Sequence, residues 1–183
     1  MSYRPVTDMW LLARAKLKGG KKYYGAYLGG FPERARVLLG ASLSDPVLHV
    51  CGGMARYYPY KAGFGPNDRT LDMSAATEPD YIGDAAVRAY YPDGFQAMLA
   101  DPPYSAEDAA HYSPGAIAYP SPNRLVENMI DALPVGGRAG IIHYILPALI
   151  GKTRKPRAAS SRAEAMPVIQ PPSRKRRTPG CGC

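Results

Sequence analysis

Long apolar runs are missing from this 183-residue chain, and Met1–Asp8 lacks the apolar core of a secretory signal. A membrane-spanning helix needs about 18 or more consecutive apolar residues, so we expect a cytoplasmic protein without a membrane partner. Cysteine is also scarce, with three residues at Cys51, Cys181 and Cys183. This number makes no disulfide framework, and two thiols near one terminus fall short of the four ligands of structural zinc. We therefore expect no metal site.

Acidic residues are outnumbered, with 15 Asp and Glu against 23 Lys and Arg, and the excess is unevenly placed. Residues 1–150 hold 14 basic and 14 acidic residues, whereas residues 151–183 hold 9 basic residues and only Glu164. The second segment is also rich in Pro, Arg and Ser, which is typical of disorder. We therefore expect a catalytic domain over 1–150 and a mostly disordered tail over 151–183. The tail either contacts a phosphate backbone or is simply solvated.

Short apolar runs alternate along the chain with patterns of helical spacing. The runs that predict strands are Pro46–Cys51, Arg69–Met73, Gly94–Ala100 and Arg138–Ile145, with a loop or weak strand over Pro79–Asp84. Helices are predicted from Phe31 and from Ser121. This alternation predicts an α/β fold, with a mostly parallel sheet and helices on both faces.

Two of the predicted strands end in residues suited to a ligand, and parallel strands present such ends at one edge of the sheet. The first strand ends in Cys51, Gly52 and Gly53, where missing side chains let a ligand approach the backbone. The second strand ends at Asp72, whose carboxylate can accept hydrogen bonds from ribose hydroxyls. A turn and a helix cap explain these residues equally well when each is taken alone.

The strongest signal is Asp101-Pro102-Pro103-Tyr104, directly after the run Gly94–Ala100. The two prolines stop the ladder of the sheet and fix the backbone, which sets the Pro102 carbonyl beside the Asp101 carboxylate. Two adjacent acceptors suit an exocyclic amino group, and Tyr104 offers a flat face for stacking a base. A loop with a cap and two prolines is the simpler alternative. Ser105–Tyr112 follows, either as a mobile lid or as a polar surface loop.

The four residues Asp101–Tyr104 resemble motif IV of the S-adenosylmethionine-dependent amino-methyltransferases, which methylate an exocyclic nitrogen of adenine or cytosine in DNA. Val47–Gly53 resembles the cofactor loop of that family, although it departs from the usual acidic-x-Gly-x-Gly pattern. Asp72 matches the acid that binds the cofactor ribose, and Asp84 matches the residue near the cofactor adenine. Tyr24–Gly30 is similar to the segment that touches the methionine moiety.

The resemblance covers about residues 23–147 and is closest to small methyltransferase-like proteins of phages and prophages. It implies a class I, Rossmann-like methyltransferase and a DNA substrate, with adenine N6 ahead of cytosine N4 because cytosine enzymes more often carry Ser at the position of Asp101. The implied catalytic residues are Asp101, Pro102, Pro103 and Tyr104. The implied residues for S-adenosyl-L-methionine are Tyr24, Cys51, Gly52, Gly53, Asp72 and Asp84.

Two features depart from the family. The chain leaves no room for a target-recognition domain, and only Met166–Gln170, which Pro167 interrupts, is a candidate strand beyond the fifth. The sheet therefore either lacks its last strands or continues through Met166–Gln170. Three other functions stay open: methylation of a guanine amine in RNA, methylation of a glutamine amide in protein, and nucleic-acid binding without catalysis.

Overall fold

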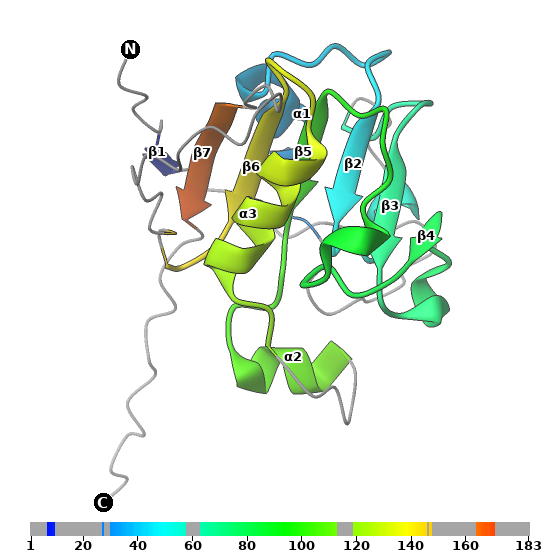
Figure 1. Cartoon of the computed structure of the whole chain (residues 1–183), viewed down its shortest axis with the longest axis vertical. Coiled ribbons are helices and arrows are strands. Elements are labelled where there is room, and N and C mark those ends of the chain that lie inside the picture. Colours follow the sequence, from blue (N-terminus) through cyan, green and yellow to red (C-terminus); the bar gives the residue numbers. More distant parts are fainter. Residues whose placement is uncertain are drawn as a thin grey trace, which may run out of the picture.

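The computed structural model describes residues 7–9, 27, 30–57, 63–112, 119–145, 147 and 164–170. The strands join one sheet in the order β1-β7-β6-β5-β2-β3-β4, and each neighbouring pair is parallel (Figure 1). The strands are β1 (Thr7–Met9), β2 (Val47–Val50), β3 (Arg69–Asp72), β4 (Tyr81–Ile82), β5 (Ala97–Ala100), β6 (Arg138–Ile142) and β7 (Glu164–Gln170). The predicted α/β fold with a parallel sheet is confirmed.

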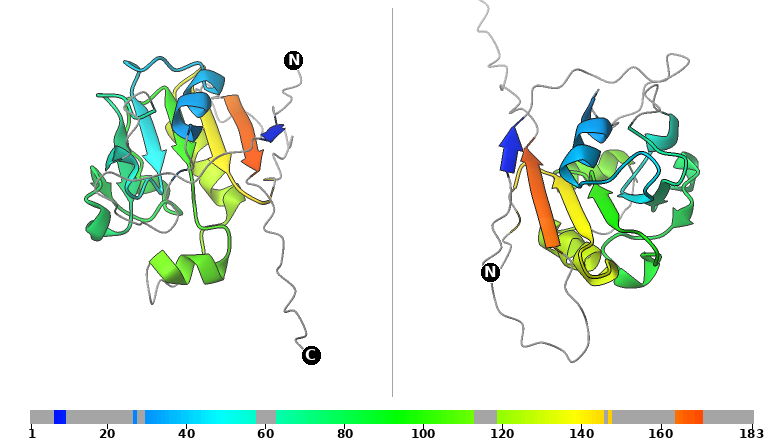
Figure 2. Two further views of the ribbon diagram at one scale, coloured as in Figure 1. Left: turned by 180° about the vertical axis from the view of Figure 1, so that it is seen from behind. Right: turned by 90° about the horizontal axis from the view of Figure 1, so that it is seen from above.

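Three α-helices accompany the sheet: α1 (Phe31–Leu38), α2 (Ala106–Tyr112) and α3 (Pro122–Ala132). Helices α1 and α3 each carry a proline in the first turn, where the missing N–H costs no hydrogen bond. They lie on opposite faces of the sheet (Figure 2), whereas α2 lies beyond the ends toward which the strands point (Figure 1). No helix among the described residues is long and apolar enough to cross a membrane.

Alternation along the central strands builds two apolar layers, as expected for strands buried on both faces. The layer under α3 contains Leu48, Val50, Leu71, Met98, Ala100 and Ile141, with Leu125 and Met129 from the helix. The layer under α1 contains Val47, Ala97, Leu99 and Ile142, with Phe31 and Ala35 from the helix. Because successive residues of β2 and β5 enter different layers, both strands are fixed in register at the centre of the fold.

The far edge of the sheet extends beyond β6. Strand β7 pairs in parallel with β6, and β1 pairs in parallel with β7. Strand β7 comes from the range that we expect to be the tail, so a sheet that ends at β6 is excluded. The rest of the tail lies outside the described residues, and its disorder stays a prediction.

All four strands are shorter than the runs that predict them, and β5 and β6 differ most, by three residues each. Strand β5 begins at Ala97 because Gly94, with φ 93°, turns the chain just before it. Strand β6 ends at Ile142, since the next residue, His143, accepts a hydrogen bond from the Ile145 N–H at 2.9 Å and bends the chain.

Candidate active site at the strand ends

The register of the sheet brings three predicted site segments to one edge. Val50, at the end of β2, stands opposite Leu71 of β3 and Ala100 of β5. The Gly52 N–H donates to the Leu71 carbonyl at 3.2 Å, and the Asp101 N–H donates to the Val50 carbonyl at 3.2 Å. The residues that follow β2, β3 and β5 therefore leave the sheet side by side.

The loop after β2 is bound to the acid at the end of β3. Cys51 has φ 53° and Gly53 has φ 47°, so Cys51 holds a conformation that glycine adopts more easily. Gly52 is also required, because a Cβ there would lie 2.7 Å from the His49 carbonyl oxygen. Asp72 accepts the Gly53 N–H at 2.8 Å on Oδ2 and the Ser74 N–H at 2.9 Å on Oδ1. Asp72 thus shapes the loop and keeps lone pairs for further donors.

Asp84 follows the edge strand β4 and completes an acidic group. It accepts the Ala86 N–H at 2.8 Å, and the preceding Gly83 N–H donates to the Asp72 carbonyl at 3.0 Å. Burial raises the pKa of the Cys51 thiol, and the charges of Asp72, Asp101 and Asp84 raise it further.

None of these three carboxylates takes part in an ion pair found among the described residues. Burial raises the pKa of Asp72 despite its main-chain N–H donors. The strand-end edge therefore carries negative charge that no basic side chain of the described region offsets, which favours a cationic ligand.

Asp101 is partly buried and accepts one hydrogen bond, from the Tyr104 hydroxyl to Oδ1 at 2.8 Å. Burial raises the pKa of Asp101 to about 7, although the bond from Tyr104 lowers it in part. No described residue donates to Oδ2 of Asp101, so this oxygen is an available acceptor at the sheet edge. Pro102 is buried and Pro103 half-buried, which agrees with a rigid loop after β5.

The structure adds an aromatic neighbour that the sequence did not single out. Tyr144, which is 42% exposed, follows β6 and meets the Tyr104 ring at a centroid distance of 4.5 Å and an interplanar angle of 62°. Tyr144 falls in the last residues of the predicted strand Arg138–Ile145, and an aromatic at that end, where the other predicted site residues gather, is the signal that could have identified it. The surface beside Asp101 is therefore lined by two aromatic rings.

The segment after Tyr104 is a helix, so the expectation of a polar surface loop is wrong, whereas its role as a lid stays a prediction. The Ser105 hydroxyl accepts the Asp108 N–H at 3.0 Å and donates to the Asp108 carboxylate at 3.1 Å. This Ser-x-x-Asp pair is close to a capping box and could have predicted α2 from the sequence. Helix α2 stands next to the candidate site (Figure 1).

Tyr24 lies outside the described residues, so its predicted contact with the cofactor stays a prediction. Tyr27, in the same segment, is buried, and its hydroxyl lies 3.1 Å from Nδ1 of His49 in β2. This contact holds Tyr27 against the centre of the sheet.

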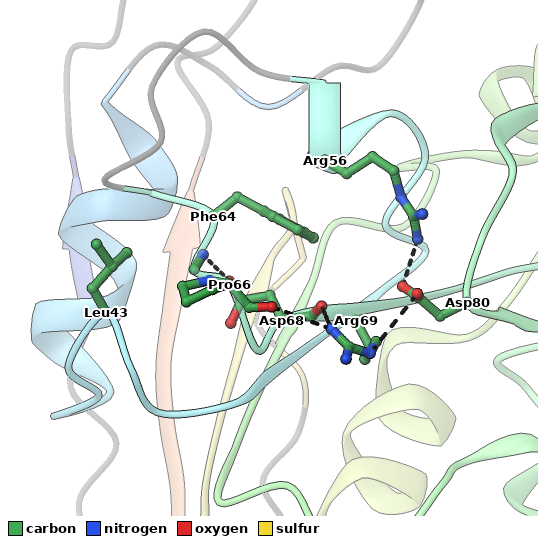
Figure 3. A pocket seen from close by; sticks show the side chains of 8 residues that line it. Leu43, Arg56, Phe64, Pro66, Asp68, Arg69 and Asp80 are labelled. Carbon is green, nitrogen blue, oxygen red and sulfur yellow. Dashed lines mark hydrogen bonds and ion pairs between the residues drawn. The ribbon is translucent and has the colours of Figure 1, made fainter.

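A hollow of about 440 Å³ lies at the opposite ends of β3 and β4 (Figure 3). Arg56 and Arg69 in its wall both face Asp80, and Asp68 is bound to the buried Arg36. Each of the charged side chains in its wall therefore already has a partner of opposite charge. It contains none of the predicted site residues, and its position before the strands separates it from the strand-end edge.

Comparison with protein-family models, curated proteins and solved structures gives no match for this chain. The candidate site is therefore judged by its own geometry. It combines a glycine loop tied to an acid, an available carboxylate oxygen after β5 and two aromatic rings.

Proposed function

We propose that this protein is a class I methyltransferase that moves a methyl group from S-adenosyl-L-methionine to an exocyclic amino nitrogen of a DNA base, with adenine N6 first. The observation that carries the proposal is Asp101, whose unbonded Oδ2 lies at the carboxyl end of β5, next to the glycine loop after β2. Tyr104 is bound to the other oxygen of this carboxylate, and Tyr144 packs against the Tyr104 ring, so aromatic surface for a planar base lies at this acceptor.

The residues after β2, β3 and β4 suit the methyl donor. Gly52 and Gly53 keep the backbone open to a ligand, and Asp72 has lone pairs for ribose hydroxyls. The donor carries a positive sulfonium, which supplies an activated methyl group without a metal. The unpaired carboxylates Asp72, Asp84 and Asp101 favour a cation at this edge.

The residues after β5 suit the acceptor amine. An aryl amine is a poor nucleophile because its lone pair is delocalised into the ring. Hydrogen bonds from its two N–H groups to Asp101 and to the Pro102 carbonyl would favour a pyramidal nitrogen with an exposed lone pair. That nitrogen forms the new bond to the methyl carbon as the carbon–sulfur bond breaks. Asp101, with its pKa of about 7, is suited to take the proton that the nitrogen must lose.

The deciding experiment is transfer of a radiolabelled methyl group to phage or host DNA, followed by digestion to nucleosides. We expect label in N6-methyladenine, and no label with Asp101→Ala. RNA and ribosomal protein are run beside DNA as acceptors. Label in RNA or protein alone would overturn the DNA assignment, and binding of the methyl donor without any transfer would identify a non-catalytic relative.

The contribution of the tail to DNA binding needs a variant that keeps β7. Deleting residues 151–183 would remove this strand, so the better change replaces Arg174, Lys175, Arg176 and Arg177 by Gln. If these residues contact phosphates, the slope of log affinity against log salt falls by up to about 3.6. Equal slopes for wild type and variant would show a solvated tail.

A further inference from the structure

A chain of hydrogen bonds ends on the main chain of Tyr104. His143, with 0% of its surface exposed, follows β6 and accepts the Ile145 N–H on Nδ1 at 2.9 Å. Its Nε2 lies 2.7 Å from the hydroxyl oxygen of Tyr119, which precedes α3. The Tyr119 hydroxyl in turn lies 3.2 Å from the Tyr104 carbonyl oxygen. Three segments that are distant in sequence thus meet behind the loop after β5.

The hydrogen positions in this chain follow from its first member. A main-chain N–H can only donate, so Nδ1 of His143 carries no hydrogen. A neutral ring then carries its hydrogen on Nε2 and donates it to the Tyr119 oxygen. The Tyr119 hydrogen is left to point at the Tyr104 carbonyl, which can only accept. Burial lowers the pKa of His143, which agrees with a neutral ring.

The same histidine also contacts the side chain of Tyr104. The two rings meet edge to face, with centroids 5.6 Å apart and an interplanar angle of 89°. The main chain of Pro103 faces the His143 ring as well. The backbone and the ring of Tyr104 are therefore both held from the end of β6, at a residue that does not reach the surface.

We propose that His143 and Tyr119 are positioning residues. His143 donates to Tyr119, and Tyr119 donates to the Tyr104 carbonyl, and these bonds hold Tyr104 in the orientation needed to stack on a base. The effect on methyl transfer rests on the proposed function. The chain itself can be tested without any methyl transfer. His143 is fully buried, and the Tyr119 hydroxyl is engaged with His143 and with the Tyr104 carbonyl, so both act through Tyr104.

The first test is NMR of the full-length protein at pH 8, with a nitrogen spectrum for labelled histidine and a carbon spectrum for labelled tyrosine rings, in which Tyr104→Phe assigns the Tyr104 signals. The chain has three histidines, and His143→Gln assigns the relevant signals. We expect the neutral Nε2–H form for His143. Tyr119→Phe should shift its Nε2 signal and the ring signals of Tyr104, whereas Tyr90→Phe, at an exposed tyrosine, should shift neither. An Nδ1–H form, or Tyr104 signals unchanged by Tyr119→Phe, would overturn the proposal.

The second test separates the two ring nitrogens by kinetics. The Gln amide places a donor near the position of Nε2 and can keep the bond to Tyr119, whereas the Asn amide places an acceptor near the position of Nδ1 and keeps only the bond from Ile145. We therefore expect His143→Gln to keep more activity than His143→Asn. Tyr119→Phe should lower the methyl-transfer rate about tenfold with unchanged affinity for the methyl donor. The double variant His143→Asn/Tyr119→Phe should be no slower than the slower single variant.

The two failures are distinguishable. If wild type transfers no methyl group to any acceptor while the NMR results are as expected, the proposed function fails and the hydrogen-bonded chain stands. If wild type is active and Tyr119→Phe is as active as Tyr90→Phe, the positioning role fails and the proposed function stands.

Discussion

Two acids at opposite ends of the same sheet, the buried Asp68 and the partly buried Asp101, have opposite surroundings. Asp68, 2% exposed before β3, forms an ion pair with Arg36, faces Nε2 of His49 at 3.1 Å and accepts the main-chain N–H groups of Val47 and Gly65. Burial alone would raise the pKa of Asp68, but these partners outweigh it and the pKa is lowered. Asp101 has one neutral donor, and burial raises its pKa to about 7.

Asp68 therefore stabilises the folded state, whereas keeping Asp101 in its place costs folding free energy. Asp68 ties α1 to β2 and to the chain before β3, and each of its oxygens has more than one partner. Among the described residues, Asp101 has no cationic partner and no donor to its second oxygen, so its burial lowers stability at neutral pH. Groups of the second kind concentrate at functional sites, which is why we place the chemistry at the carboxyl ends of the strands.

Removing Asp68 should have the largest effect. Asp68→Ala leaves the Arg36 charge buried without its partner, so we expect a loss of about 3–5 kcal/mol in the free energy of unfolding. Urea unfolding measures it. The control, Asp93→Ala at an exposed acid, should stay within about 0.5 kcal/mol of wild type. A loss below about 1 kcal/mol would show that Asp68 does not hold these elements together.

Removing Asp101 should instead affect turnover. Asp101→Ala deletes an acceptor that matters mainly in the transition state, so we expect the rate of methyl transfer to fall by about a hundredfold or more. Affinity for S-adenosyl-L-methionine, measured by calorimetry, should change far less. Asp93→Ala again serves as the control. Wild-type turnover of Asp101→Ala on every amine substrate would identify the Asp101–Tyr104 segment as a structural turn.

The sequence predicts the centre of this fold better than its edges. The apolar runs of β2, β5 and β6 identify strands because each strand is buried on both faces and most of its residues are apolar whichever way they point. Nothing in Thr7–Met9 indicates a strand, since β1 exists only through its pairing with β7. Pairing between distant segments leaves no local pattern.

The candidate site divides in the same way. The Gly52-Gly53 loop and Asp101–Tyr104 are local signals, and parallel strands bring them together as expected. The contacts that surround Tyr104 join residues up to 40 positions apart, Tyr144 among them, and no spacing rule predicts them. The state of Asp101 likewise depends on burial, which the sequence does not give.

Because Asp68 and Asp101 have opposite surroundings, we expect their contributions to the free energy of unfolding to change with pH in opposite directions. Asp101 has a higher pKa in the folded than in the unfolded chain, so its folded form gains stability on acidification from about pH 7 to pH 4. Asp68, with its lowered pKa, contributes stability that is lost only below its ordinary value of 3.8. Asp101→Asn should therefore match wild type in urea near pH 4. At pH 8 it should be more stable by up to about 4 kcal/mol, which is the rise in pKa from 3.8 to about 7 expressed as free energy. A difference that stays constant with pH would contradict the raised pKa.

We expect the smallest effect from removing the Tyr104 hydroxyl, which is the donor to Asp101 among the described residues. Tyr104→Phe keeps the flat ring and removes the hydroxyl, whose bond lowers the pKa of Asp101. Without it the pKa of Asp101 should rise further, by about one unit, and less of the carboxylate should be ionised at pH 7. We expect methyl transfer within about twofold of wild type at pH 9 but up to about tenfold slower at pH 7. Tyr104→Ala, which also loses the stacking surface, should cost about 1–3 kcal/mol at both pH values. Equal losses for Tyr104→Phe at pH 7 and pH 9 would mean that Tyr104 serves only as a stacking surface and that Asp101 gains no ionisation from its hydroxyl.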